Sequence, residues 1–152
     1  MTLFIHRLAV SISFLCIAIF FLATALAEFF GTYETIAEIK NLIVWPGLYI
    51  FVPAMIFSGA SGFLLAKSRS GRLVQQKKKR MPFIAANGVL ILIPCALFLA
   101  HKASIAEFDV AFYAMQIIEL LAGAINLTLL SMSMRDGLKT SGRYRALVTI
   151  SQ

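Results

Sequence analysis

The chain has 152 residues, of which 60% are apolar and only 14% are charged, and its mean hydropathy is +0.86. A soluble domain normally carries about 25% charged residues, so this composition excludes an ordinary water-soluble fold and predicts an integral membrane protein. The net charge of +7 would suit a nucleic-acid partner, but the placement of the basic residues argues against one.

Four apolar stretches are long enough to cross a hydrocarbon core about 30 Å thick, which needs about 20 residues of helix. They lie at residues 8–28, 41–66, 82–101 and 110–133. Because the connections are short, neighbouring helices are expected to pack antiparallel. The prediction is a single all-α transmembrane domain over residues 1–152, a four-helix antiparallel bundle.

The first stretch ends in Ala25-Leu26-Ala27-Glu28, which resembles the cleavage site of a secretory signal peptide. Its apolar part, from Leu8 to Thr24, is longer than the usual signal core of about 7 to 15 residues. A retained first helix is the preferred interpretation, and cleavage is the alternative.

The second stretch, 41–66, carries small residues at every fourth position from Ala54 to Gly62. Such ridges let helix backbones approach closely, either within the bundle or between copies of the chain. Pro46 and Pro53 predict kinks. A homo-oligomer is expected, because four short helices enclose little volume alone.

Basic residues are concentrated in the connection 67–81 and in the tail 134–152, whereas the other two connections are mostly acidic. Lys and Arg are enriched in cytoplasmic loops. Both termini and the basic loop are therefore predicted to face the cytoplasm of a bacterial-type inner membrane. Beside membrane helices, these residues are expected to attract anionic lipid headgroups at about 1 kcal/mol each, rather than nucleic acid.

The third stretch, 82–101, ends at His101, and the only other histidine is His6. Four-helix bundles can hold haem between histidines on facing helices, but these two are predicted at opposite sides of the membrane. Ligation by His101 alone, or shared across a dimer, keeps haem open as a cofactor, with quinone as a second redox candidate. The sequence has no catalytic motif and no metal-ligand cluster, so no enzyme class is supported.

The fourth stretch, 110–133, places Glu119 about 15 Å from its outer end, near the bilayer midplane. At about 100° per residue, Gln116, Glu119, Gly123 and Asn126 share one face of the helix, so the carboxyl group need not face lipid. An ionisable residue at this depth is by default a functional site.

Depth counting also predicts the partner of Glu119. With Lys40 as the outer end of the second helix, Tyr49 lies about 13 Å deep and is the expected hydrogen-bond partner. No buried lysine or arginine is expected nearby, so Glu119 is predicted to be neutral. A deeper polar layer, about 21 to 27 Å from the outer ends, is expected to form hydrogen bonds between helices; its members are Asn126, Asn87, Ser58 and Ser11.

Three functions fit this pattern. The preferred one is binding of a small ligand, or handling of protons or cations, at an intramembrane polar site of Glu119, Gln116, Asn126 and Tyr49. The second is a haem- or quinone-associated redox bundle. The third is a non-catalytic accessory or assembly protein whose polar layers only specify helix packing.

Overall fold

The structure of the chain is a computed structural model that describes the backbone of residues 2–67 and 72–140 and the side chains of residues 4–64 and 79–136. Within these ranges it is helical throughout, without strands. The elements in chain order are α1 (Thr2–Phe30), α2 (Tyr33–Leu42), η1 (Ile43–Leu48), α3 (Tyr49–Lys67), α4 (Arg72–Asn87), η2 (Gly88–Leu92), α5 (Ile93–Ser104) and α6 (Val110–Thr140).

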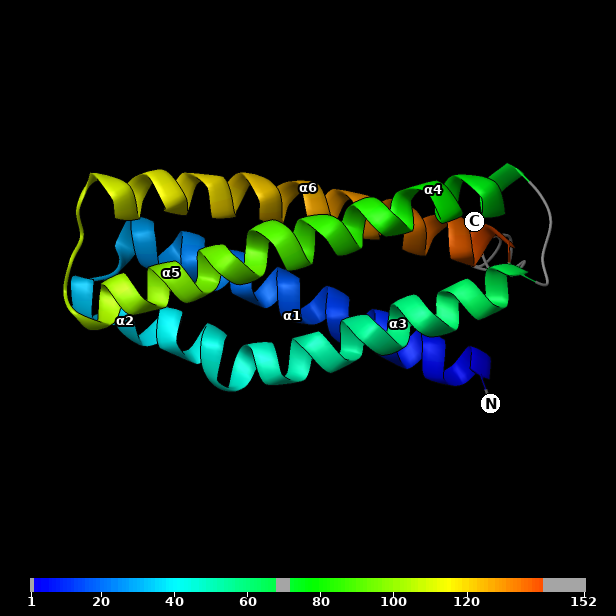
Figure 1. Cartoon of the computed structure of the whole chain (residues 1–152), viewed down its shortest axis with the longest axis horizontal. Helices are drawn as coiled ribbons and strands as arrows, with labels where there is room; N and C mark the ends of the chain where they lie inside the picture. The colour runs from blue at the N-terminus through cyan, green and yellow to red at the C-terminus, as the bar shows by residue number, and fades with distance from the viewer. Residues whose placement is uncertain (1, 68–71, 141–152) are drawn as a thin grey trace, which may run out of the picture.

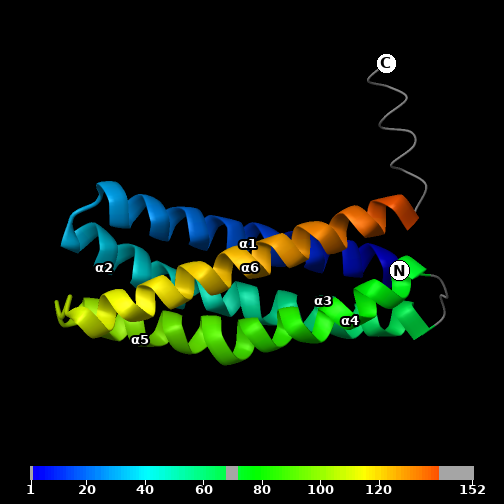
Figure 2. The same cartoon turned by 90° about the horizontal axis from the view of Figure 1, so that it is seen from above.

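These elements form four long rods that lie side by side (Figures 1 and 2). Two short π-helical segments, η1 and η2, join α2 to α3 and α4 to α5. The rods are therefore α1, α2–η1–α3, α4–η2–α5 and α6. The turns at residues 31–32 and 105–109 share one end of the bundle, here called the two-loop end. The start of α1 and the end of α6 lie at the other, the terminal end (Figure 1).

Each rod contains a helical segment long and apolar enough to cross a membrane, as predicted. The four segments are Phe4–Phe30, Tyr33–Leu64, Lys79–Ser104 and Val110–Asp136. Large apolar side chains cover the outside of the bundle, as with Ile19 and Leu22 on α1 and Leu121 on α6. Such a surface suits lipid tails, and the pattern is that of a multi-pass membrane protein.

The second rod begins at Tyr33, well before the predicted start at residue 41. Thr32 is the N-cap, and its hydroxyl accepts a hydrogen bond from the Thr35 amide at 3.3 Å, which satisfies one of the free donors of the first turn. The first turns of α2 are polar, so hydropathy alone misses them. Since Ile36 and Lys40 are both buried, Lys40 lies on the inner face of this rod and not at its end.

The predicted kink at Pro46 is confirmed. Pro46 lies in η1, where the preceding Trp45 leaves the helical region with φ −132° and ψ 113°. The same segment packs closely on α1, because a Cβ atom on Gly47 would lie 2.7 Å from the Phe20 ring. Any larger residue here would force the Phe20 ring to shift.

The small-residue ridge of α3 packs inside the bundle. Ala54 and Gly62 are buried, and Ser58 between them is half-buried. A Cβ atom on Gly62 would lie 3.1 Å from Cε1 of His6 on α1. The ridge thus brings α1 and α3 together within one chain, as in other membrane helix pairs.

An apolar core closes the bundle near the two-loop end. Leu99 and Phe112 are fully buried there, between α5 and α6. In lipid, such contacts stabilise by close packing rather than by release of water. The cluster lies directly beside the polar site described next, and consists of Ala27, Ile36, Leu99, Ala103 and Phe112.

Candidate functional site

Glu119 of α6 forms an ion pair with Lys40 of α2. The Lys40 side chain is only 1% exposed and that of Glu119 11%. Counted from Tyr33 and Val110, the two residues lie about 10 and 14 Å inside their rods, from the same two-loop end. Buried charges persist only when they are paired and hydrogen-bonded, so this pair is the electrostatic centre of the site.

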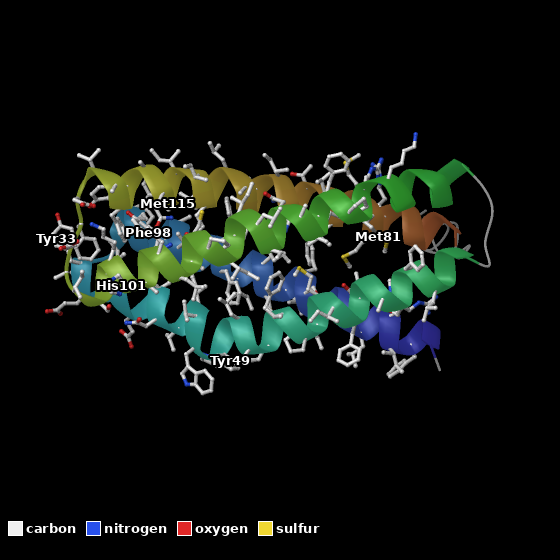
Figure 3. The ribbon with its side chains drawn as sticks, in the orientation of Figure 1. Tyr33, Tyr49, Met81, Phe98, His101 and Met115 are labelled. Atoms are coloured by element: carbon white, nitrogen blue, oxygen red, sulfur yellow. The ribbon has the colours of Figure 1, made fainter. Side chains whose placement is uncertain are left out.

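The predicted partner of Glu119 and the predicted absence of a buried cation beside it are both wrong. Tyr49 (Figure 3) is 67% exposed, so it is not the partner. Its ring packs edge-on against that of Trp45, with ring centroids 4.3 Å apart. A buried cation does exist, so the reason for expecting a neutral Glu119 no longer holds. Both errors follow from the wrong helix start. Counted from Tyr33, Tyr49 lies about 24 Å from the two-loop end, well below Glu119.

Two polar side chains complete the immediate surroundings of the pair. Gln116 donates from Nε2 to Oε2 of Glu119 at 3.1 Å, one turn away on the same helix, as the shared face predicted. Lys40 also donates from Nζ to Oγ1 of Thr24 on α1 at 3.4 Å. Gln116 and Thr24 are each 3% exposed. The site therefore joins three rods, with Thr24 as a member that the sequence analysis missed.

A second carboxylate, Glu28, belongs to the same site and was also missed. It lies one turn after Thr24 on α1 and interacts electrostatically with both Lys40 and Glu119. Glu28 is half-buried, and its Oε1 atom is buried without a hydrogen-bond partner among the described residues. Lys40 is paired with Glu119, and Glu28 interacts with both at longer range, so the site carries one negative charge in excess when all three groups are ionised.

A cavity of about 50 Å³ borders the ion pair. Glu119 and Thr24 supply polar groups to its wall, and the remaining wall is made of apolar side chains and Gly123 from all four rods. Ile17 of α1 also lines it. A Cβ atom on Gly123 would lie 3.3 Å from the Phe21 ring, so the glycine allows α1 to approach α6 closely beside the cavity.

The deeper polar layer is only partly as predicted. Asn87 donates from Nδ2 to the Ala122 carbonyl of α6 at 2.8 Å, a bond between helices. The Ser58 hydroxyl instead donates to the Met55 carbonyl of its own helix at 2.9 Å, and Ser11 is half-buried. Asn126 is 0% exposed, yet neither atom of its amide group has a partner in the described part of the chain.

The two histidines lie at opposite ends of the bundle, as predicted. His101 is exposed in the last turn of α5 at the two-loop end (Figure 3). His6 is buried near the terminal end, with Nδ1 3.0 Å from the Ser61 hydroxyl of α3. They cannot bind one iron together within a chain, and His101 as a single ligand stays an untested prediction.

Further ion pairs lie at the two ends of α6. At the terminal end Arg80 of α4 donates to Asp136 at 2.8 Å. At the two-loop end Lys102 donates to Glu107 at 2.7 Å and to Asp109 at 2.8 Å. The Lys102 ammonium and the Phe112 amide hold the pKa of Asp109 below its ordinary value. Asp109 is also the N-cap of α6.

Comparison with protein-family models, with curated proteins and with solved structures finds no match to this chain. Its function is therefore argued from the site itself. That site contains an ion pair inside the four-rod bundle, a second carboxylate nearby, two hydrogen-bonding side chains and a small cavity.

Proposed function

We propose that this protein binds and releases a proton at the intramembrane site formed by Glu28, Lys40 and Glu119. The observation that carries the proposal is the buried Lys40–Glu119 ion pair with a second carboxylate, Glu28, near enough to interact electrostatically with both groups. A net charge in a medium of low dielectric constant is costly. The site reaches neutrality by holding one proton, and a monovalent cation is the competing species for the same position.

Glu28 is the residue that carries the exchangeable proton. Oε2 of Glu119 already accepts hydrogen bonds from Lys40 and Gln116, whereas Oε1 of Glu28 has no partner among the described residues. Glu28 also lies two residues before the end of α1 at Phe30, about 3 Å from the helix end. It therefore stands between the deep ion pair and the water at the two-loop end.

The distribution of basic residues supports an orientation for this exchange. Lys and Arg are concentrated in the segments 67–81 and 134–152 of the sequence. The described parts of these segments lie at the terminal end, where α3 and α6 finish and α4 begins, and the positive-inside rule assigns that end to the cytoplasm. The two-loop end then faces outward, and Glu28 exchanges protons with the outer solution of a bacterial-type inner membrane.

The proposal is tested by counting protons with carboxyl-specific infrared difference spectroscopy on the protein in lipid nanodiscs. Neutrality of the site predicts that wild type takes up about one proton per chain as the pH is lowered. Glu28→Gln and Glu119→Gln should each take up none, because one carboxylate then balances one ammonium. Lys40→Met should take up about two, because both carboxylates must be neutralised.

Glu107→Gln is the matched control, because Glu107 pairs with Lys102 on the exposed surface. This variant should take up the same number of protons per chain as wild type. Unchanged uptake in Glu28→Gln, or reduced uptake in Lys40→Met, would refute the proposal. If sodium or potassium ions suppress the uptake in competition with protons, the exchanged species includes a metal cation.

An accessory role is the second candidate, and a specific observation favours it. Lys40–Glu119 ties α2 to α6, and Arg80–Asp136 ties α4 to α6 near the other end. Such pairs can specify which helices pack together. In that case Glu28→Gln and Glu119→Gln would alter stability or partner assembly, and the infrared titration would show no uptake in wild type.

A further inference from the structure

We infer that the apolar cavity beside Glu119 binds a short primary alkylammonium ion, with the ammonium group of the ion on the Glu119 carboxylate and its alkyl chain in the cavity. This inference rests on the proposed function and names a ligand for the same site. When the ion binds, Glu28 releases its proton to the outer solution. The protein thus exchanges one organic cation for one proton.

The polar atoms of the site that lack a partner among the described residues are acceptors. Oε1 of Gln116 and Oε1 of Glu28 are both buried and without a hydrogen bond there. Oε2 of Glu119 accepts from Lys40 and from Gln116, which leaves Oε1 of Glu119 open to a further donor. Glu119 lines the cavity and keeps 11% exposure. The site therefore needs a donor, and a primary ammonium group offers three N–H bonds.

Thr24 gives the cavity wall a second acceptor. Its side chain lines the cavity, and its hydroxyl oxygen accepts from Lys40 at 3.4 Å. A hydroxyl oxygen has two lone pairs, so one of them remains for a ligand. The ammonium group thus finds a carboxylate and a hydroxyl in a wall that is otherwise apolar.

The charge of the site favours a cation at this position. With Lys40, Glu119 and Glu28 ionised, the site has one negative charge in excess. A monovalent ammonium ion balances that charge, as a proton on Glu28 does. The ion and the proton together would leave a net positive charge in a medium of low dielectric constant, which is costly. Binding of the ion therefore releases the proton from the Glu28 carboxyl group, and only that O–H bond breaks.

The remainder of the cavity suits hydrocarbon. Apart from Glu119 and Thr24, its wall is made of apolar side chains and Gly123, which offer no partners to water or to a hydrated metal ion. An apolar cavity of about 150 Å³ holds benzene, which is about 25 Å³ per carbon atom. The volume of about 50 Å³ therefore takes about two carbon atoms, as in an ethyl group, and is too small for a ring.

Both π-helical segments border this cavity. Ile43 and Leu48 of η1 and Leu92 of η2 belong to its wall. A π-helical turn is wider than an α-helical turn, is rare, and occurs frequently at functional sites. Two such segments on separate rods meet at one cavity here. This arrangement is that of a small-molecule site, in which a mostly apolar wall carries a few polar groups.

The inference is tested on the full chain in lipid nanodiscs, at a pH at which wild type holds its proton. Ethylammonium chloride is added, and the protonated carboxyl band is followed by infrared difference spectroscopy. Ethylammonium should remove about one protonated carboxyl group per chain. Methylammonium and ammonium should need successively higher concentrations, by about fourfold for each carbon atom removed. Cyclohexylammonium should act no better than ammonium. Ethanol has the chain without the charge and should release no proton.

Ala96→Leu is the cavity-filling variant, since Ala96 is buried in the cavity wall. Its larger side chain should occupy the space of the ethyl group. The concentration of ethylammonium that gives half of the release should rise about tenfold or more, while proton uptake stays at the wild-type level. Ala60→Leu is the matched control, because Ala60 is exposed on α3, and it should respond as wild type does. If Ala96→Leu does not fold, Ala96→Val replaces it, with a smaller rise expected.

Three outcomes overturn the inference: ethylammonium acting no better than ammonium on wild type, release of the proton by ethanol, or a wild-type response in the Ala96 variant. The same spectra separate the inference from the proposed function. Normal proton uptake without release by ethylammonium leaves the proposed function intact and removes the ligand. Absence of uptake in wild type removes the proposed function, and the exchange with it.

Discussion

Replacing Lys40 by methionine should destabilise the folded bundle strongly. The substitution keeps an unbranched apolar side chain of similar length and removes the ammonium group. Glu119, 11% exposed, then loses its cation and retains the hydrogen bond from Gln116. The Thr24 hydroxyl also loses a donor.

Two lines of reasoning give the same magnitude. Removing one member of a buried ion pair costs about 3 to 5 kcal/mol. Alternatively, the variant neutralises the carboxyl by taking up a proton. For an ordinary glutamate with a pKa of about 4.3, neutralisation at pH 7 costs about 3.7 kcal/mol. The free energy of unfolding of Lys40→Met is therefore expected to be about 3 to 4 kcal/mol lower than that of wild type at pH 7. Since protonation becomes easier by about 1.4 kcal/mol per pH unit, the loss should shrink as the pH is lowered toward 5.

The loss is measured by unfolding in mixed micelles with increasing sodium dodecyl sulfate, followed by circular dichroism. Lys40→Met/Glu119→Gln should recover most of the stability, because replacing both partners of a buried pair by neutral groups costs little. Tyr49→Phe is the control, since Tyr49 lies outside the site. A loss below about 1 kcal/mol in Lys40→Met, or a double variant no more stable than the single one, would refute the pairing energetics.

Three further predictions concern other parts of the bundle, and the first two use the same unfolding assay. Gly47→Ala should destabilise the bundle, because the added Cβ atom would lie 2.7 Å from a ring atom of Phe20 on α1. A Cβ atom on Gly59 has no such neighbour within 4 Å, so Gly59→Ala should leave the free energy of unfolding unchanged or raise it by up to about 1 kcal/mol. Asn87→Leu should lower the free energy of unfolding by about 0.6 to 1.7 kcal/mol, because Asn87 is hydrogen-bonded to a neighbouring helix. Asn126 has no such bond among the described residues, so Asn126→Leu should not lower it. The pKa of Asp109 is lower when folded than when unfolded, so its stabilising contribution is complete above its ordinary pKa and disappears as the pH falls through the folded value. Asp109→Asn should remove that acid-dependent part of the melting curve, and an unchanged curve would contradict the capping contact.

The four spans follow directly from composition and length. A helix surrounded by lipid needs about 20 apolar residues, and each of the four stretches satisfies this independently of its neighbours. The burial of Glu119 was predictable for a similar reason: Gln116 and Asn126 share its face of α6, and both are buried. Periodicity within one helix is a local property, and it is preserved when the helix packs.

The partners of Glu119 were decided by tertiary packing. Lys40 was hidden because α2 begins in a polar segment at Tyr33, where hydropathy gives no signal of a membrane helix. An earlier start, suggested by the Thr32 cap and by Ile36 and Lys40 on one face, would have placed Lys40 at the depth of Glu119.

Thr24 and Glu28 could not be assigned even then. The hydrogen bond of Thr24 to Lys40 and the nearness of Glu28 to the pair depend on the rotation of α1 and on its close approach to η1 at Gly47, which no property of a single helix specifies. Composition thus determined that the chain has four stretches able to span a membrane, and helical periodicity determined that Glu119 faces inward. Both properties depend on one helix at a time. Only the packed bundle decided that Lys40 pairs with Glu119 and that Glu28 lies near this pair, because that arrangement depends on how separate helices are placed against one another.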